Sequence, residues 1–528
     1  MSLAEKIPLQ QSETVSSTKR IAKNTLMLYF RQILIMAVSL YTVRVVLNVL
    51  GAEDYGIFGV VGGVVTFFSF LSGTMASATQ RFFSFAIGKN DLQQLKETFC
   101  VNLVIYAVIS VFAVILLESV GLWFIQNKMS VPPQRFDAAC RLFQLSIFSF
   151  IASIIASPFM AIVIAHEDMQ IYAFLSVIEA VLKLAVVYLL SAISADKLVL
   201  YGTLLLAIAL FNVLSYISIC IIKYVECQFR CFFWNKTLFK EIMKFTGWTL
   251  FGAFTSVGRT QAVTILLNQF FSPIVIAART IATTVNSQVN VFSTNFNTSL
   301  YPPIIKEYAS GNKEEMFRLL YNGSKMTFFL MWVFALPLFL HMDYVLTFWL
   351  KNPPEHAIFF TRLALIESVI VASALPLCTA ARAPGKMMGY ELALGTVQLL
   401  IFVADWILLR TGFDAWIVFV VATIGNAVMY ILRLVILRIL VSFRILEFTR
   451  RVLLPLAEAS GVSLAASFAV AYFTPYKFVF VAFSVLLSIV FSSLAMYFLG
   501  MDKESRKKVM EILGRKIPML KKQVGEIE

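Results

Sequence analysis

Residues 478–500 read FVFVAFSVLLSIVFSSLAMYFLG, a run without a single charged side chain. A helix needs about 20 apolar residues to cross the roughly 30 Å of hydrocarbon in a bilayer. The whole chain of 528 residues has the same character, with 59% hydrophobic and 14% charged residues and a mean hydropathy of +0.82. Soluble domains carry about 45–50% apolar and about 25% charged residues, so a water-soluble protein is excluded. The composition predicts an all-α polytopic membrane protein.

Hydrophobic runs that are broken by charges and turn residues predict about 14 transmembrane helices. They cover residues 24–49, 54–79, 97–119, 139–165, 170–191, 199–222, 246–270, 273–300, 322–342, 356–381, 388–409, 414–439, 451–472 and 478–500. Segments 54–79 and 273–300 are the least hydrophobic of these, and their assignment depends on an internal repeat.

The repeat has an offset of about 220 residues. Val45–Asn48 resembles Ile265–Asn268, and Ala86–Asn90 resembles Ala309–Lys313 at nearly the same spacing. Six predicted helices separate the copies, so both halves run in the same sense through the membrane. We therefore predict two parallel six-helix lobes and two further helices. The expected segments are a cytoplasmic N-terminal stretch (1–23), the lobes (24–222 and 246–439), a cytoplasmic loop between them (223–245), helices 13 and 14 (451–500) and a basic tail (501–528).

Lysine and arginine residues gather in alternate loops and in the tail, which predicts that both termini are cytoplasmic. Residues 1–24 contain no apolar core with a cleavage site, so the first helix is expected to direct insertion. The basic charges are dispersed over separate loops, and this argues against nucleic-acid binding. The tail either lies on the inner leaflet as an amphipathic helix or is a solvated basic extension.

Several segments are similar to the polysaccharide-export flippases of the multidrug/oligosaccharidyl-lipid/polysaccharide exporter superfamily. They are Ala78–Lys89, Ala165–Glu167 with Glu179–Leu184, and Ala380–Lys386. The resemblance implies two lobes around a central cavity, alternating access, and a bacterial inner-membrane location. It also implies a polyprenyl-diphosphate-linked oligosaccharide as cargo, for O-antigen, capsule or exopolysaccharide assembly.

Arginines inside predicted helices are the first candidate site residues, because a charge in the membrane costs about 2.5–3.5 kcal/mol on insertion scales. Guanidinium groups bind phosphate with paired hydrogen bonds, as a diphosphate cargo would require. The candidates for the diphosphate are Arg31, Arg44, Arg259 and Arg279. Arg44 can also be read as a side chain that snorkels to the outer interface.

A polar stripe on segment 273–300 is the second candidate, for contacts with the glycan. Its residues recur at steps of three or four, which places them on one face of a helix. The stripe consists of Arg279, Thr283, Asn286, Asn290, Ser293 and Asn297. Hydrogen bonding between helices is the alternative explanation, at only about 0.6 kcal/mol per contact.

Acidic residues inside helices could couple transport to H+ or Na+. Glu367 has no neighbour in sequence except Arg362, so it is the main candidate, whereas Glu179 and Lys183 are also spaced for an ion pair of their own. Asp405 is expected near the outer surface and solvated. Segment 24–49 has no carboxylate, unlike the drug-exporting branch.

Catalytic, metal and cofactor sites are not expected. Cys227 and Cys231 have no further ligands nearby, and His166–Asp168 is interpreted as a polar turn. A membrane glycan polymerase or ligase is disfavoured because the predicted outer loops are short. A peptidoglycan-precursor flippase and a multidrug exporter stay open as alternatives, as do the oligomeric state and the coupling ion.

Overall fold

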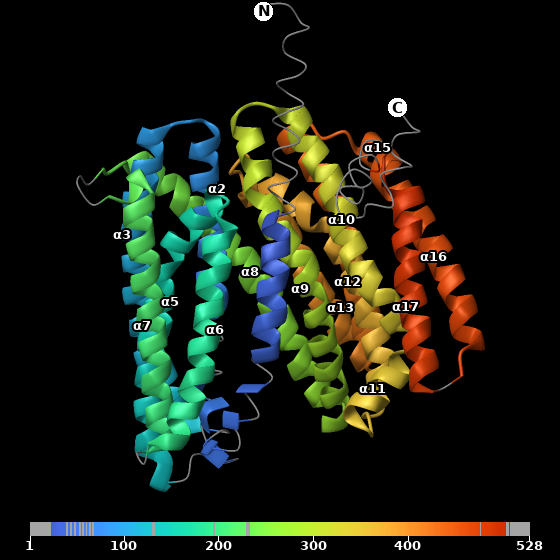
Figure 1. Cartoon of the computed structure of the whole chain (residues 1–528), viewed down its shortest axis with the longest axis horizontal. Coiled ribbons are helices and arrows are strands. Elements are labelled where there is room, and N and C mark those ends of the chain that lie inside the picture. Colours follow the sequence, from blue (N-terminus) through green and yellow to red (C-terminus); the bar gives the residue numbers. More distant parts are fainter. Residues whose placement is uncertain are drawn as a thin grey trace, which may run out of the picture. The chain divides into compact units, whose positions relative to one another are not determined.

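The computed structural model describes residues 23–38, short stretches between 41 and 65, and residues 68–128, 133–193, 196–228, 233–475, 477–502 and 506. Within this part of the chain every regular element is a helix (Figure 1). Eleven helical segments there are long and apolar enough to cross a membrane. The all-α membrane fold class is thus confirmed, and the protein is a multi-pass membrane protein.

The chain divides into two compact units by its internal contacts. Unit 1 comprises Met1–Thr255, Thr298–Met316 and Gly385–Leu392, and unit 2 comprises Ser256–Asn297, Phe317–Pro384 and Ala393–Glu528. The long helices α8 (Lys236–Phe270) and α9 (Pro273–Ala309) therefore contribute residues to both units.

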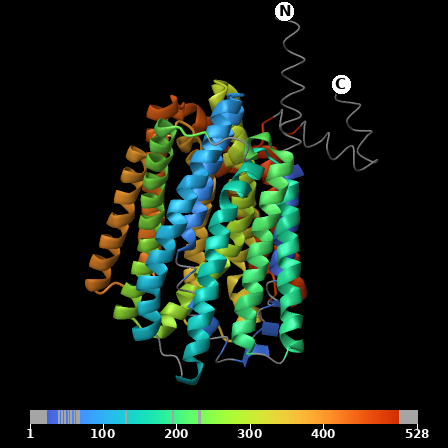
Figure 2. The same ribbon diagram turned by 90° about the vertical axis from the view of Figure 1, so that its left-hand side faces the viewer.

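Unit 1 is built around α5, which packs against α2, α3 and α7. Figure 2 looks onto this unit and shows its helices, in blue to green, running side by side. Its complete helices are α2 (Ser69–Gly88), α3 (Leu92–Leu116), α4 (Leu122–Lys128), α5 (Phe136–Ala165), α6 (Met169–Ala192) and α7 (Lys197–Lys223). Short helical turns at η1 (Leu117–Gly121), η2 (Pro133–Arg135) and η3 (Val225–Cys227) join some of them.

Unit 2 contains most of α10 (Lys313–Leu340), from Phe317 onward, and most of α13 (Met388–Arg410), from Ala393 onward. Its complete helices are α11 (Met342–Leu350), α12 (Ala357–Arg382), α14 (Ile417–Val441), α15 (Ile445–Phe448), α16 (Leu454–Phe473) and α17 (Phe478–Ala495), with π-helical turns at η4 (Thr449–Leu453) and η5 (Met496–Gly500). Buried serines lie on α16 and α17, which pack together. Small residues at such positions allow two membrane helices to approach closely.

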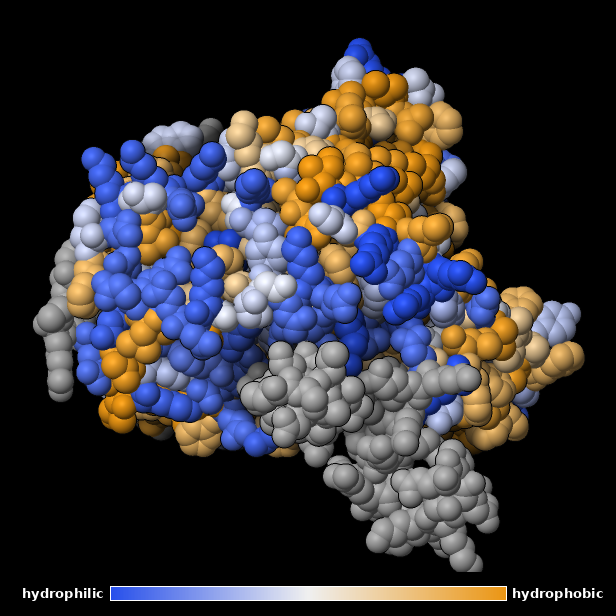
Figure 3. Space-filling view, turned by 90° about the horizontal axis from the view of Figure 1, so that it is seen from above, coloured by the Kyte–Doolittle hydropathy of each residue, from blue (hydrophilic) through white to orange (hydrophobic). Residues whose placement is uncertain are grey.

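Polar caps fix where several helices begin. The Asp91 side chain accepts a hydrogen bond from the Gln94 backbone N–H (2.9 Å), Asp196 caps α7, and Asn235 caps α8. Exposed polar side chains such as Lys89 and Gln93 surround the turn between α2 and α3, and hydrophilic residues cover this end of unit 1 on the left of Figure 3. Large apolar side chains such as Ile222 and Phe473 are exposed elsewhere, as expected for surfaces that face lipid.

Many predicted helix boundaries agree with the structure, but several helices are longer than predicted. α8 begins at Lys236 instead of residue 246, α9 ends at Ala309 instead of residue 300, and α10 begins at Lys313 instead of residue 322. The helix predicted to end at residue 79 continues as α2 to Gly88. Arg81 lies inside this longer helix, where its guanidinium lies over the rings of Phe82 and Phe85 at 4.6 and 4.8 Å. This cation–π stacking lets the charge remain inside a continuing helix. The tail from residue 507 onward lies outside the described residues.

Candidate functional site

Unit 2 contains charged side chains that are largely shielded from solvent. Two of them, Arg259 on α8 and Glu367 on α12, face each other as an ion pair. An Arg259 Nη2 atom lies 4.0 Å from Glu367 Oε1, and both side chains are less than one-fifth exposed. Asn426 on α14 donates a hydrogen bond of 2.8 Å to the same Glu367 oxygen. The sequence suggested Arg362 as a partner for Glu367, but Arg362 instead pairs with Asp343 and the Phe339 carbonyl.

Arg279, near the start of α9, is the second cation of this group. Its Nη1 donates to Thr264 Oγ1 (2.5 Å) and its Nη2 to the Thr260 carbonyl (3.2 Å), both on α8. These partners are neutral oxygens, so they position the guanidinium without cancelling its charge. Arg279 also lies within electrostatic range of Arg259, and the two cations therefore form a local concentration of positive charge.

Asp405 on α13 is the residue that the sequence misplaced. It was expected to be solvated near the outer surface, yet the structure buries it completely, with 0% exposure. Among the described residues, none hydrogen-bonds either carboxylate oxygen. Arg259, Arg279 and Glu367 are its electrostatic neighbours. The depth of Asp405 along α13 was predictable from the sequence, whereas the direction in which it points was not.

The four side chains together form what we call the charge cluster: Arg259, Arg279, Glu367 and Asp405. They come from four helices, α8, α9, α12 and α13, and they offer two cations and two carboxyl groups. Two carboxylates are too few for a metal site of the usual kind, and no group of three or more metal-ligating residues occurs in the described part of the chain. Guanidinium groups such as these pair with carboxylates and with phosphates through the same kind of hydrogen bonds.

The predicted polar stripe on α9 lies largely against neighbouring helices of unit 2. Asn290 donates to Ser368 on α12 (2.9 Å), and Ser368 is also hydrogen-bonded to Asn286. Ser293 is 0% exposed and donates to the Thr327 carbonyl on α10 (2.8 Å), so its expected glycan contact is corrected to a helix–helix contact. Asn297 lies 3.4 Å from Thr379 on α12. Only Thr283 among the neutral members of the stripe is exposed.

A second group of polar side chains on α9 is exposed; it includes Thr283 of the stripe, and its other members were missed. Its members are one or two helical turns apart, as Thr280 and Thr284 or Ser287 and Thr294 are, and this spacing could have revealed them. They are Thr280, Thr283, Thr284, Ser287, Gln288 and Thr294. Hydroxyl and amide groups of this kind can hydrogen-bond to sugars.

The remaining predicted site residues belong to unit 1. Arg31 is 9% exposed, and its guanidinium lies 4.6 Å from the centre of the Tyr172 ring. Glu179 and Lys183 form an ion pair of 2.7 Å within one helix, and Asn212 also donates to Glu179. Arg44 lies outside the described residues.

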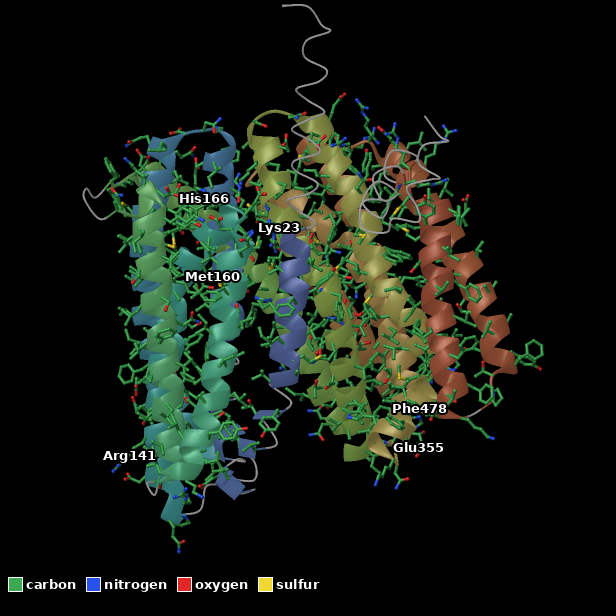
Figure 4. All side chains as sticks on the ribbon, viewed as in Figure 1. Lys23, Arg141, Met160, His166, Glu355 and Phe478 are labelled. Atoms are coloured by element: carbon green, nitrogen blue, oxygen red, sulfur yellow. The ribbon has the colours of Figure 1, made fainter. Side chains whose placement is uncertain are left out.

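The two ends of unit 1 are each held by polar contacts. At one end, Lys306 pairs with Glu167 at 2.7 Å, and the Glu167 side chain is 1% exposed. At the other end, Arg135 pairs with Asp196 (2.8 Å) and with Asp54. Figure 4 shows His166 and Arg141, which lie close in sequence to these groups, at opposite ends of the unit 1 helices.

The fold is similar to that of solved MATE transporters. One match is described as the outward-facing conformation of a multidrug resistance MATE family transporter of the MOP superfamily, with a TM-score of 0.68, 15% identity, and coverage of 80% of this chain and 96% of that chain. A MATE structure in a straight conformation gives a TM-score of 0.67 at 14% identity, covering 81% of this chain and 96% of that one.

A third match is a MOP superfamily transporter from Pyrococcus furiosus whose binding pocket is described as having reverse polarity. Its TM-score is 0.62 at 14% identity, with coverage of 81% of this chain and 97% of that chain. No family profile matches the sequence, and no curated protein matches it. The protein therefore has a MATE-like fold.

Proposed function

We propose that this protein is a flippase that carries a polyprenyl-diphosphate-linked oligosaccharide from the cytoplasmic to the outer leaflet of a bacterial inner membrane. The observation that carries the proposal is the pair of arginines inside unit 2, Arg259 and Arg279, on two helices of a transporter-like fold. Buried cations are costly in a membrane helix, and an anionic cargo gives them a function.

The exposed hydroxyl and amide groups of α9 support the glycan part of the proposal. They lie on the same helix as Arg279, so a headgroup held at Arg279 would leave its sugars beside Thr283 and its polar neighbours. Arg31 and Arg44 remain further candidates for the diphosphate. Alternating access is the expected mechanism, as it is the general mode of transporters with internal repeats.

A multidrug exporter is the second candidate. The buried carboxyl groups of Glu367 and Asp405 favour it, since carboxylates can bind cationic drugs or a coupling H+ or Na+. A peptidoglycan-precursor flippase would use the same diphosphate chemistry as the first candidate. We do not propose an enzyme, and we propose neither a cofactor nor a nucleic-acid partner.

Deletion of the gene tests these alternatives. We expect a lipid-linked oligosaccharide to accumulate on the cytoplasmic side and surface polysaccharide to be lost, with both effects reversed by a plasmid copy. Accumulation of the peptidoglycan precursor would favour the second flippase. If no lipid accumulates while resistance to toxic cations falls, the protein is an exporter.

The proposal also includes cytoplasmic termini. Within each unit, segments that we expect on the outer side lie at the same end of the helices, which supports this orientation. Arg135 and Asp196 are paired in unit 1, and Glu355 and Phe478 lie at one end of unit 2 in Figure 4. An impermeant thiol reagent should label Lys197→Cys and Lys351→Cys in intact cells but not Lys240→Cys. Labelling of Lys240→Cys would reverse the orientation.

A further inference from the structure

The positive and negative charges of the charge cluster balance each other, but Arg259 and Glu367 do not form a close ion pair. Arg259 approaches Glu367 only to 4.0 Å, and among the described residues none accepts a hydrogen bond from Arg259 Nε. Arg279 donates to the neutral oxygens of Thr264 and Thr260. Tight arginine–carboxylate pairs are instead usually bidentate at about 2.7–2.9 Å. Arg259 thus keeps a hydrogen-bond donor that a stronger anion could use.

The carboxyl groups nevertheless have a clear electrostatic role. A cation inside a low-dielectric interior needs a counter-charge, because leaving it uncompensated is strongly destabilising. Glu367 and Asp405 are the acidic groups that lie within electrostatic range of Arg279. They supply negative charge to the arginines as long as no other anion is bound.

Glu367 also has a contact that does not depend on the arginines. The Asn426 amide donates to it at 2.8 Å, and the same amide nitrogen lies 3.0 Å from the Ala422 carbonyl, which fixes its position on α14. A carboxyl group that loses Arg259 would therefore remain hydrogen-bonded to Asn426. Displacement of Glu367 from Arg259 leaves it buried but with a polar partner.

We propose that Glu367 and Asp405 act as an internal counter-anion, which competes with the diphosphate of the cargo for Arg259 and Arg279. This inference rests on the proposed function, because it takes a diphosphate as the ligand. When the site is empty, the carboxyl groups compensate the arginines; when cargo binds, its phosphates replace them. The competition weakens cargo binding and thereby assists release of the cargo and return of the empty protein.

The test measures binding of farnesyl diphosphate to the purified full chain by calorimetry, with farnesol as the uncharged control. Glu367→Gln and Asp405→Asn each remove a competing charge and keep a similar shape. We expect each variant to bind farnesyl diphosphate about tenfold more tightly than the wild type, while its export rate in cells falls. A residue with a purely structural role would not make binding tighter when it is replaced.

Two matched variants complete the design. Arg259→Gln should weaken binding at least about tenfold. Glu118→Gln also removes a carboxylate from a membrane helix, but one in unit 1 that accepts a hydrogen bond from Gln144, so its affinity should equal that of the wild type. Tighter binding by Glu118→Gln would show a general charge effect and would overturn the inference.

The failures of the two proposals are distinguishable. If neither the wild type nor any variant binds farnesyl diphosphate, the diphosphate cargo itself is refuted. If the wild type binds and the two carboxyl variants bind equally or more weakly, the counter-anion is refuted and the flippase proposal stands. If Asp405→Asn does not fold, Glu367→Gln decides alone, because its amide still can contact Asn426.

Discussion

One group of buried charges in each unit shows a difference in how closely the partners are paired. In unit 1 the buried Glu167 carboxylate pairs with Lys306 at 2.7 Å, and the buried Arg31 guanidinium lies against the Tyr172 ring. In unit 2 the charge cluster is loose, with 4.0 Å between Arg259 and Glu367 and an Asp405 that makes no hydrogen bond to the residues that the structure describes. Short pairs already have their partners, whereas loose ones can accept a ligand. We infer that the Lys306–Glu167 pair of unit 1 holds the fold and that the charge cluster of unit 2 handles the cargo.

The largest expected effect is on stability, at the buried pair of unit 1. Lys306→Ala would leave the Glu167 carboxylate, whose side chain is 1% exposed, without this lysine. Removing one partner of a buried ion pair costs about 3–5 kcal/mol. We expect the free energy of unfolding, measured by denaturant titration in detergent, to fall by that amount.

The matched control for this pair is the double variant Lys306→Met with Glu167→Gln. It removes both charges and keeps most of the volume, so it should recover much of the lost stability. A single Lys306→Ala variant as stable as the wild type, but unable to export, would reverse the assignment of roles to the two units.

The second effect is on transport, at the cluster of unit 2. Arg259→Ala should reduce export by about ten- to a hundredfold at normal protein abundance, which corresponds to the loss of about 1.5–3 kcal/mol from a charged hydrogen bond. Arg259→Lys should keep part of the activity, because the charge remains while the planar fork is lost. Surface polysaccharide, normalised to protein in the membrane, measures both.

Arg31→Ala is the comparison variant for Arg259→Ala. If Arg31 mainly packs against Tyr172, its loss should lower stability more than export. Full export by Arg259→Ala would remove this arginine from the mechanism.

A third effect concerns two glycines of α2. A Cβ atom at Gly88 would lie 2.7 Å from the backbone of Lys306, whereas a Cβ at Gly73 would meet nothing within 4 Å. Overpacking typically costs about 1–3 kcal/mol, so Gly88→Ala should destabilise the protein by that amount and Gly73→Ala should not. Gly73→Leu then tests passage: a stable variant that fails to export would indicate that cargo moves along this face of α2.

Much of the fold could be predicted from the sequence because helix length and hydropathy are local properties. Each predicted helix from 97–119 onward appears in the structure, although α8, α9 and α10 extend beyond their predicted bounds. Arg259, Arg279 and Glu367 were each recognised as membrane charges that needed a function. That these three side chains lie close together in space was not predictable, because it depends on which faces of α8, α9 and α12 pack together. Asp405 shows this most clearly, since its distance from the end of α13 indicated solvent while its direction around the helix placed it in the interior.

The polar stripe of α9 was also predicted in sequence but not in its contacts. The spacing correctly placed Asn286, Asn290 and Asn297 on one face, but spacing does not reveal what that face contacts. Asn290 donates to Ser368, which keeps its bond to Asn286 when Asn290 is removed. Asn290→Ala should therefore lower the free energy of unfolding by only about 0.6 kcal/mol, the average for hydrogen bonds between membrane helices.

Thr283→Ala provides the contrast within the same helix. Thr283 is exposed and its hydroxyl donates only to the Thr280 carbonyl within α9, among the contacts that the structure describes, so stability should not change measurably. If the exposed face of α9 contacts sugars, export of the oligosaccharide should fall for Thr283→Ala and stay normal for Asn290→Ala. The opposite outcome, with export lost in Asn290→Ala and unchanged stability, would mean that cargo contacts the partly buried Asn290 in place of Thr283.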